Sequence, residues 1–225
     1  MELSKEQLLQ IDNYISVSGV KYYDVRTEIV DHFANILEQK LDKNPDLNFK
    51  KEIQNIHRNF SDRGFSKLLE QKTKSVSKKF YQQSLKHLIT FFKIPKIIIT
   101  GALFYVLFLI MNFFEDKKTF FSILTGLGFI LVLLIFIKIS VDKKLKKGLF
   151  LKLDMNTGFL QVFNLMIICF NSITTFRSSE SFFNVTYNSV QLTIFVLLIL
   201  FYWSGINVYY QNKKIVKKQY PNILV

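Results

Sequence analysis

The chain has 225 residues, of which 49% are hydrophobic, and its formal net charge is +13. Its single cysteine, Cys169, excludes an intrachain disulfide and a cysteine-based metal cluster. Nucleic-acid binding is not indicated either, because residues 1–70 carry 12 acidic and 10 basic side chains and the positive excess lies further along the chain.

Residues 1–75 are predicted to form a small cytosolic domain of short helices. The first ten residues lack the pattern of a cleavable signal peptide, so we expect none. Ser4 and Gln7 have the spacing of a capping box that begins a first helix, and Gly19 ends it. A second helix is expected over about 22–41, before the turn at 44–46.

A third helix is predicted to begin near Asn48 and to end before Gly64. Its apolar residues recur with the 3.6-residue period of an amphipathic helix, and they are Phe49, Ile53, Ile56 and Phe60. Ser66 can cap a fourth helix, whose later part, 76–95, is predicted to be a basic amphipathic helix next to the membrane. Residues 71–96 contain seven lysines and no acidic residue.

Four apolar blocks follow, and each is long enough to cross a hydrocarbon core of about 30 Å. They cover 97–114, 120–137, 158–176 and 190–209, within a transmembrane domain of 96–212. The tail 213–225 is basic. The predicted fold is therefore all-α, with a cytosolic helical domain followed by a four-helix transmembrane bundle.

The lysines predict the orientation, because they gather on alternate connections. They are Lys143, Lys144, Lys146, Lys147 and Lys152 after the second block, and Lys213, Lys214, Lys217 and Lys218 after the fourth. The positive-inside rule places both termini in the cytoplasm. Abundant Lys, Asn, Ile and Phe are typical of a bacterium of low GC content. With the four apolar blocks, the expected localisation is the inner (cytoplasmic) membrane of a bacterium, as a multi-pass protein. Anionic lipids would attract the excess charge by about 1 kcal/mol per lysine.

Two segments of the N-terminal domain resemble a known family. They are YYDVRTEIVDHFANILEQ and, about twenty residues later, FSDRGFSKLLEQ, and the matching positions are Glu28, Ile29, Val30, Asp31, His32, Phe60, Gly64 and Leu68. The first 75 residues are similar to the HAAS-type and permease-prefix domains of bacterial membrane proteins. Many members of that family are encoded beside PadR-type transcriptional regulators, so the resemblance implies signalling or regulation and carries over no catalytic residue.

Four charged or titratable residues of the second helix are candidate partner-binding residues: Arg26, Glu28, Asp31 and His32. Glu28 and His32 are four residues apart and share one helix face. A hydrogen-bond network that holds the helix against its neighbours is one interpretation, and a protein-binding patch is another. A metal site is the third, although neither His57 nor His87 has the spacing to complete a ligand set. We expect no cofactor.

The third span carries a candidate intramembrane polar face, formed by Thr157, Gln161, Asn164, Asn171 and Thr175. At about 100° per residue these side chains share an arc of about 80°. Amides in hydrocarbon need partners, so the polar face should point into the bundle or across a dimer interface. Helix packing and a polar path for a small solute are both consistent with it.

No Asp, Glu, Arg or His lies in the middle of any span, which disfavours proton-coupled transporters and intramembrane hydrolases. Known catalytic motifs are missing too, so we do not expect an enzyme. The predicted function is that of a regulatory or adaptor protein. Its partner would be a cytosolic protein, such as a transcriptional regulator, or a second copy of the chain, with no direct binding of nucleic acid. The alternative is a small permease or transporter subunit that uses the polar face of the third span.

Overall fold

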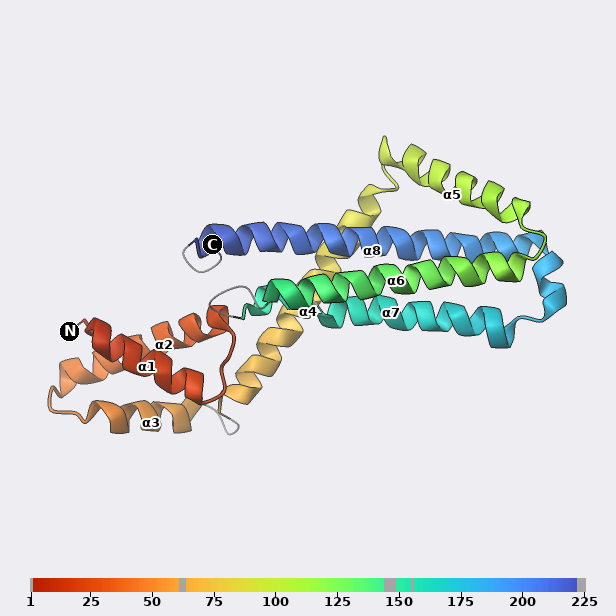
Figure 1. The fold of residues 1–225 in the computed structure, drawn as a ribbon. Helices are drawn as coiled ribbons and strands as arrows, with labels where there is room; N and C mark the ends of the chain where they lie inside the picture. The colour runs from red at the N-terminus through yellow and green to blue at the C-terminus, as the bar shows by residue number, and fades with distance from the viewer. Residues whose placement is uncertain (1, 61–63, 144–148, 155, 222–225) are drawn as a thin grey trace. The chain divides into compact units, whose positions relative to one another are not determined.

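The computed structural model describes residues 2–60, 64–143, 149–154 and 156–221, and for Lys143, Asn156 and Thr157 only the backbone. Within these ranges the chain is helical and has no strand, which confirms the all-α prediction (Figure 1). The helices are α1 (Lys5–Val17), α2 (Tyr23–Lys43), α3 (Phe49–Phe60), α4 (Phe65–Thr90), α5 (Lys96–Phe113), α6 (Lys117–Lys143), η1 (Leu151–Leu153), α7 (Asn156–Asn171), η2 (Ser172–Phe176), η3 (Ser179–Phe183) and α8 (Val185–Gln219). Lys144, Lys146 and Lys147 lie outside the described residues.

The chain forms two compact units. The N-terminal unit comprises Met1–Val76, Lys143–Asp154 and Gln219–Val225, and the apolar-helix unit comprises Ser77–Asp142 and Met155–Lys218. The connection between α6 and α7 and the end of the chain therefore belong to the same unit as α1, α2 and α3.

The N-terminal unit begins with the predicted capping box. The Ser4 hydroxyl accepts a hydrogen bond from the Gln7 backbone N–H at 3.2 Å, and the Ser4 backbone N–H donates to the Gln7 side chain at 2.8 Å. Gly19, with a φ of 100°, follows α1 in the left-handed region that glycine adopts without strain. Both predictions are confirmed.

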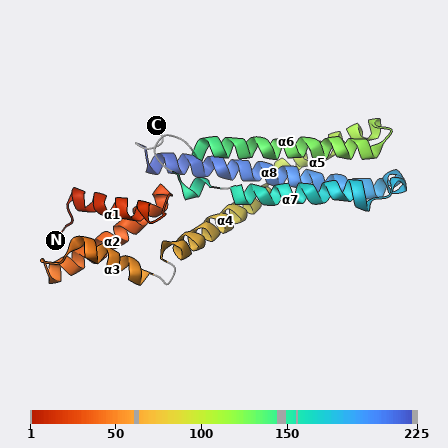
Figure 2. The same ribbon diagram turned by 60° about the horizontal axis from the view of Figure 1, so that its bottom comes forward.

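Helices α1, α2 and α3 lie next to one another (Figure 2). Their buried apolar side chains make up most of the core of this unit, together with Val20, Phe65 and Leu151. Ile11 and Ile15 of α1 and Phe33 of α2 are fully buried. The third helix adds Ile53 and Ile56, two members of its predicted apolar face. Full burial of such a side chain contributes about 1.5–3 kcal/mol, so these contacts are the main source of the unit's stability.

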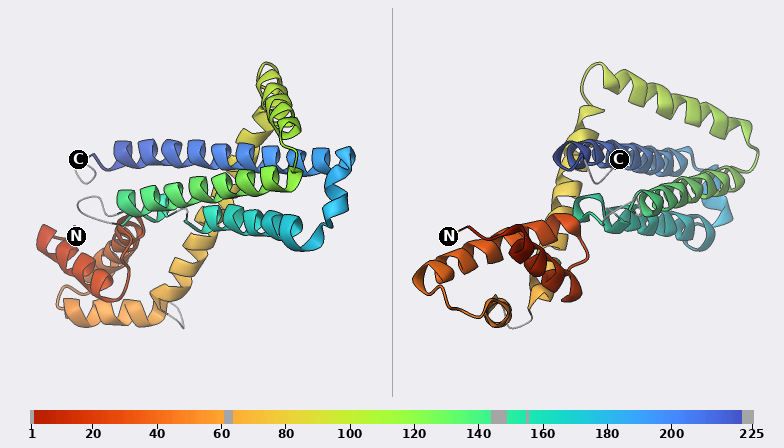
Figure 3. Two further views of the ribbon diagram at one scale, coloured as in Figure 1. Left: turned by 45° about the vertical axis from the view of Figure 1, so that its right-hand side comes forward. Right: turned by 60° about the vertical axis from the view of Figure 1, so that its left-hand side comes forward.

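Four stretches of the described chain are long and apolar enough to cross a membrane, and nearly all their residues belong to the apolar-helix unit: Lys96–Phe113, Lys117–Asp142, Leu151–Phe176 and Val185–Gln219. They are characteristic of a multi-pass membrane protein. The helices α6, α7 and α8 run side by side (Figures 1 and 2). Half of the most apolar part of α8 is buried, against 6% of the most apolar part of α5, so α8 is the central helix of this group and α5 is peripheral (Figure 3).

One aromatic side chain joins α4 to this group. Phe80 is 2% exposed, and its ring occupies the space where a Cβ atom on Gly158 would lie. A Cβ on Gly205 of α8 would also meet the Phe80 ring, at 3.2 Å. One face of the predicted basic helix 76–95 is therefore packed against α7 and α8, and the two glycines permit that close approach.

Candidate functional site

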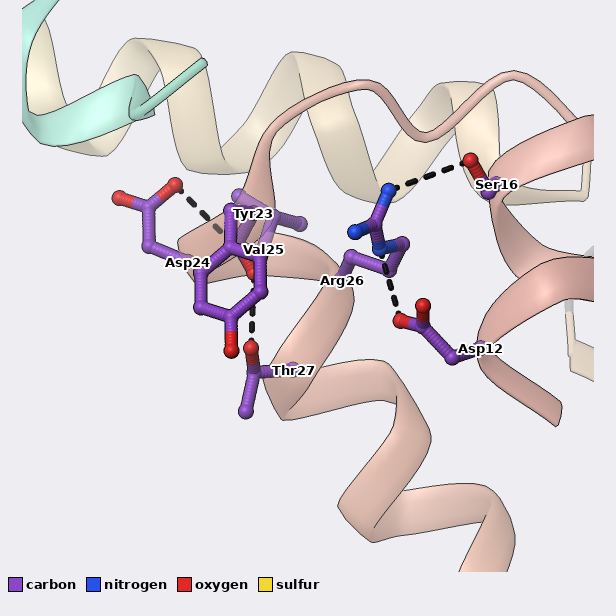
Figure 4. A network of polar contacts seen from close by, with 7 residues as sticks. All are labelled: Asp12, Ser16, Tyr23, Asp24, Val25, Arg26 and Thr27. Atoms are coloured by element: carbon purple, nitrogen blue, oxygen red, sulfur yellow. Dashed lines mark hydrogen bonds and ion pairs between the residues drawn. The ribbon is translucent and has the colours of Figure 1, made fainter. Parts of the chain in front are cut away.

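Arg26 joins α2 to α1. Its Nε lies 2.7 Å from the Asp12 carboxylate, and its guanidinium donates a hydrogen bond to the Ser16 hydroxyl at 3.1 Å (Figure 4). The guanidinium also lies over the Tyr23 ring, 5.6 Å from the ring centre. Asp12 and Ser16 both belong to α1, so Arg26 holds two helices together and is not free to bind a partner.

The other three candidate residues on α2 lie on its outer face. Glu28, Asp31 and His32 are exposed, and so are Asn35 and Gln39, which continue the same helical spacing. Glu28 forms an ion pair with Lys72 of α4 at 2.5 Å, and the His32 ring contacts Phe60 edge-on at 5.8 Å. We call this surface, Glu28, Asp31, His32, Asn35 and Gln39, the α2 face.

Metal binding gains no support from these positions. Among the residues that the structure describes, no three His, Cys, Asp or Glu side chains are grouped so that they could hold a metal ion. The His57 ring has other contacts. Its Nδ1 forms a hydrogen bond with the Tyr14 hydroxyl at 2.8 Å, and the ring stacks on that of Phe65 with the ring centres 4.2 Å apart.

A contact that the sequence did not predict lies at the beginning of α2. The segment 149–154, between α6 and α7, docks there, and we call it the loop segment. The Asp24 carboxylate accepts hydrogen bonds from the backbone N–H groups of Leu151, at 2.9 Å, and Lys152, at 3.1 Å. Asp24 thereby caps the short helix η1, whose first N–H groups have no partner within the helix.

Further contacts flank Asp24. The Tyr23 backbone N–H donates to the Leu149 carbonyl at 2.7 Å, and the Tyr22 hydroxyl donates to the Asp154 carboxylate at 2.7 Å. Burial, together with that hydrogen bond, raises the pKa of the Tyr22 hydroxyl, so the phenol stays protonated. Leu151 is 2% exposed and belongs to the core of the N-terminal unit.

Aromatic side chains complete the docking site. The Phe150 ring lies 5.7 Å from the Tyr23 ring and 5.3 Å from that of Tyr220, near the end of the chain. Lys152 also donates to the side chain of Gln219, at 3.1 Å. Three distant parts of the sequence thus meet at the beginning of α2. In the sequence, only the run Tyr22-Tyr23-Asp24 could have indicated this docking site. An acidic residue in the first turn of a helix, such as Asp24, is usually explained by its favourable interaction with the helix dipole.

The polar face of the third span is directed away from the interior of its own unit. Gln161, Asn164, Asn171 and Thr175 are exposed, and no hydrogen bond of the first three side chains exists among the described residues. The Thr157 side chain lies outside what the structure describes. The opposite side of α7 is buried and apolar, with Phe159, Val162 and Met166. Of the two environments expected for these amides, only an interface with another molecule agrees with this exposure.

Comparison of the chain with protein families, with curated proteins and with solved structures finds no match. The function is therefore inferred from the contacts of the α2 face, the loop segment and the polar face.

Proposed function

We propose that this chain is a regulatory or adaptor protein of the bacterial inner membrane, with both termini in the cytoplasm. In this proposal the four apolar helices anchor the chain, and the N-terminal unit binds a cytosolic protein. The lysines that follow the second and fourth spans support the orientation. The resemblance of residues 1–75 to HAAS-type domains supports regulation, with a transcriptional regulator as the kind of partner.

The docking of the loop segment is the observation that carries this proposal. Asp24, Tyr22 and Leu151 incorporate the connection between two spans into the N-terminal unit. Each hydrogen bond to the Asp24 carboxylate is worth about 1.5–3 kcal/mol, so the loop segment is held by more than thermal energy. A movement of α6 or α7 would therefore act on the unit that binds the partner.

The α2 face is the proposed binding surface. Its exposed residues carry two carboxylates, Glu28 and Asp31, and Lys72 neutralises the first of them. A partner with a basic contact surface fits Asp31 and the neighbouring polar side chains best. Arg26 does not belong to this surface, because it is paired inside the unit.

The partner can be tested by photocrosslinking in intact cells. A photoreactive amino acid at Asp31 should crosslink one cytosolic protein, while the same group at Lys50, an exposed residue of α3, should not. The variant Asp31→Lys should lose the complex, because it would place a positive charge opposite a basic partner. Equal crosslinking from both positions, or reporter fusions that place the N-terminus outside the cytoplasm, would contradict the proposal.

A second copy of the chain is the proposed occupant of the polar face on α7. Gln161, Asn164 and Asn171 each offer donors and acceptors, so the same face on two chains is self-complementary. Hydrocarbon cannot satisfy these exposed amides, whereas a matching helix can. The alternative function is a small permease or transporter subunit that uses the polar face of the third span. The exposure of Gln161, Asn164 and Asn171 favours a path between two chains over a path inside one chain.

A further inference from the structure

Arg177 is held in place at the end of the apolar-helix unit where η2 and η3 meet the beginning of α8. Its guanidinium donates to the Ser181 hydroxyl at 3.1 Å, to the Ser181 carbonyl at 2.7 Å and to the Asn188 side chain at 2.9 Å. It also donates to the side-chain oxygen of Gln191, and it lies over the Phe182 ring, 3.9 Å from the ring centre. These contacts use four of the five N–H groups of the side chain and fix its orientation.

The positive charge of Arg177 is not compensated. All its hydrogen-bond acceptors are neutral, and among the described residues no carboxylate forms an ion pair with it. Glu180, the nearest acidic residue in the sequence, is exposed. A fixed arginine without a counterion, next to apolar side chains and a membrane, attracts an anion more strongly than a surface arginine in water.

A pocket of about 410 Å³ opens beside this arginine. One part of its wall is polar, with Arg177, Gln191 and serine side chains, and another part is apolar, with Val190 and Ile194. The polar part can hold a charged group, and the remaining wall can hold a hydrocarbon chain.

Gln191 provides a second observation at this pocket. It is 8% exposed, and its side-chain nitrogen is buried without a hydrogen-bond partner. An unpaired buried donor costs about 1–3 kcal/mol, so such groups are rare unless something else satisfies them. Gln191 lines the same pocket, and its side-chain oxygen accepts from Arg177.

We propose that this pocket binds an anionic amphiphile, whose phosphate or carboxylate oxygens accept from Arg177 and whose chain packs on Val190 and Ile194. The neighbouring pocket, of about 420 Å³, differs in charge, because Glu115, Asp116 and Lys117 line it. The Lys117 ammonium is engaged by three backbone carbonyls at the end of α5, which leaves the two carboxylates to repel an anion. The amphiphile therefore selects the pocket with Arg177.

The test uses the full chain in phosphatidylcholine nanodiscs, with two kinds of added amphiphile. Phosphatidylglycerol presents a lipid phosphate, and dodecyl phosphate presents the same chemistry as a free molecule. We expect saturable binding of at least one of them, measured by native mass spectrometry of the released complex. Arg177→Gln should weaken it by about tenfold or more, as expected for the loss of a charge-assisted hydrogen bond.

Two variants control the charge and the fold. Lys118→Gln removes a positive charge near α5 without touching the pocket and should bind within about twofold of the unaltered chain. Val190→Trp places a larger side chain in the pocket wall without changing a hydrogen-bond partner of Arg177, and it should abolish binding. This variant tests the proposal even if Arg177→Gln does not fold. Binding of phosphatidylglycerol alone would identify a lipid as the source, and binding of dodecyl phosphate alone a free amphiphile. The proposal is overturned if neither binds better than phosphatidylcholine, or if Val190→Trp binds both as the unaltered chain does.

Discussion

The Asp24 carboxylate accepts a hydrogen bond from the backbone N–H of Leu151, although 127 residues separate the two in the sequence. The acceptor belongs to the first turn of α2, and the donor begins η1 in the connection between two apolar helices. This contact lies within the N-terminal unit and brings together a residue that precedes α6 and one that follows it. It is also the contact that makes the proposed regulatory coupling possible.

Replacing Asp24 with alanine should release the loop segment. The change removes both hydrogen bonds from the loop segment to the carboxylate, each worth about 1.5–3 kcal/mol, and leaves the N–H groups of Leu151 and Lys152 without that partner. Hydrogen exchange of the amides of Leu151 and Lys152 should become at least about tenfold faster. Asp31→Ala, which removes an exposed carboxylate from the same helix, should leave their exchange unchanged. Equal exchange in the two variants would show that Asp24 does not hold the loop segment.

Gly158→Ala should destabilise the apolar-helix unit by about 1–3 kcal/mol, the usual cost of overpacking. The added methyl group would overlap the Phe80 ring, which is buried and has little room to move. Gly126→Ala is the matched control, because a Cβ at Gly126 meets nothing within 4 Å. The midpoint of unfolding in detergent should fall for the first variant and stay or rise for the second. A neutral Gly158→Ala would mean that α4 does not pack there.

Leucine in place of Gln161, Asn164 and Asn171 should weaken self-association. Interhelical hydrogen bonds contribute about 1–2 kcal/mol each in model peptides, so the loss of three should lower the dimer fraction at least about tenfold. Energy transfer between labelled chains in vesicles would measure it. The control places leucine at Ile123, Ile130 and Ile137, three exposed residues of α6, and should associate normally. Undiminished association of the triple variant would exclude the polar face as the interface.

Acidification should loosen α3. Burial lowers the pKa of His57, so the unfolded chain takes up a proton at a higher pH than the folded chain does. The stability contributed by the neutral ring is therefore complete above the unfolded pKa of about 6.5 and is lost as the pH falls below it. The Lys40 ammonium holds the pKa of the Glu52 carboxyl below its usual value of 4.5. The stability that Glu52 contributes is therefore complete above that value and is lost only as the pH falls below it, outside the range in which His57 acts.

Hydrogen exchange of the α3 amides, measured at about pH 7.5 and about pH 5.5 and corrected for intrinsic rates, would test this. His57→Gln should reduce the pH dependence, while His32→Gln, on the exposed α2 face, should preserve it. His87 also has a pKa lowered by burial and by Lys96, but it lies on α4 and should affect α3 less. A pH dependence that survives in His57→Gln would assign the effect to another group.

Local features of this protein follow from the sequence alone. The Ser4–Gln7 capping box, the left-handed Gly19 and Gly64 and the four apolar helices were all predictable. Each depends on residues within a few positions of one another, or on the average apolarity of one segment. Hydrogen-bond geometry within a turn and transfer of a helix into hydrocarbon are local effects of this kind.

Tertiary structure alone decided where these elements meet. Helical spacing placed Gln161, Asn164 and Asn171 on one face, but only the packing of Phe159 and Met166 turned that face outward. Arg26 was a candidate partner-binding residue because it is charged and lies in the charged part of the second helix. The structure places it against Asp12, so it pairs α2 with α1. Asp24 and Leu151 are 127 positions apart in the sequence and meet only when the chain folds. Arg177 and Gln191 meet because the irregular segment with η3 returns the chain to the beginning of α8. A periodic pattern states which side chains share a surface, whereas their partners depend on contacts that form only when distant segments pack together.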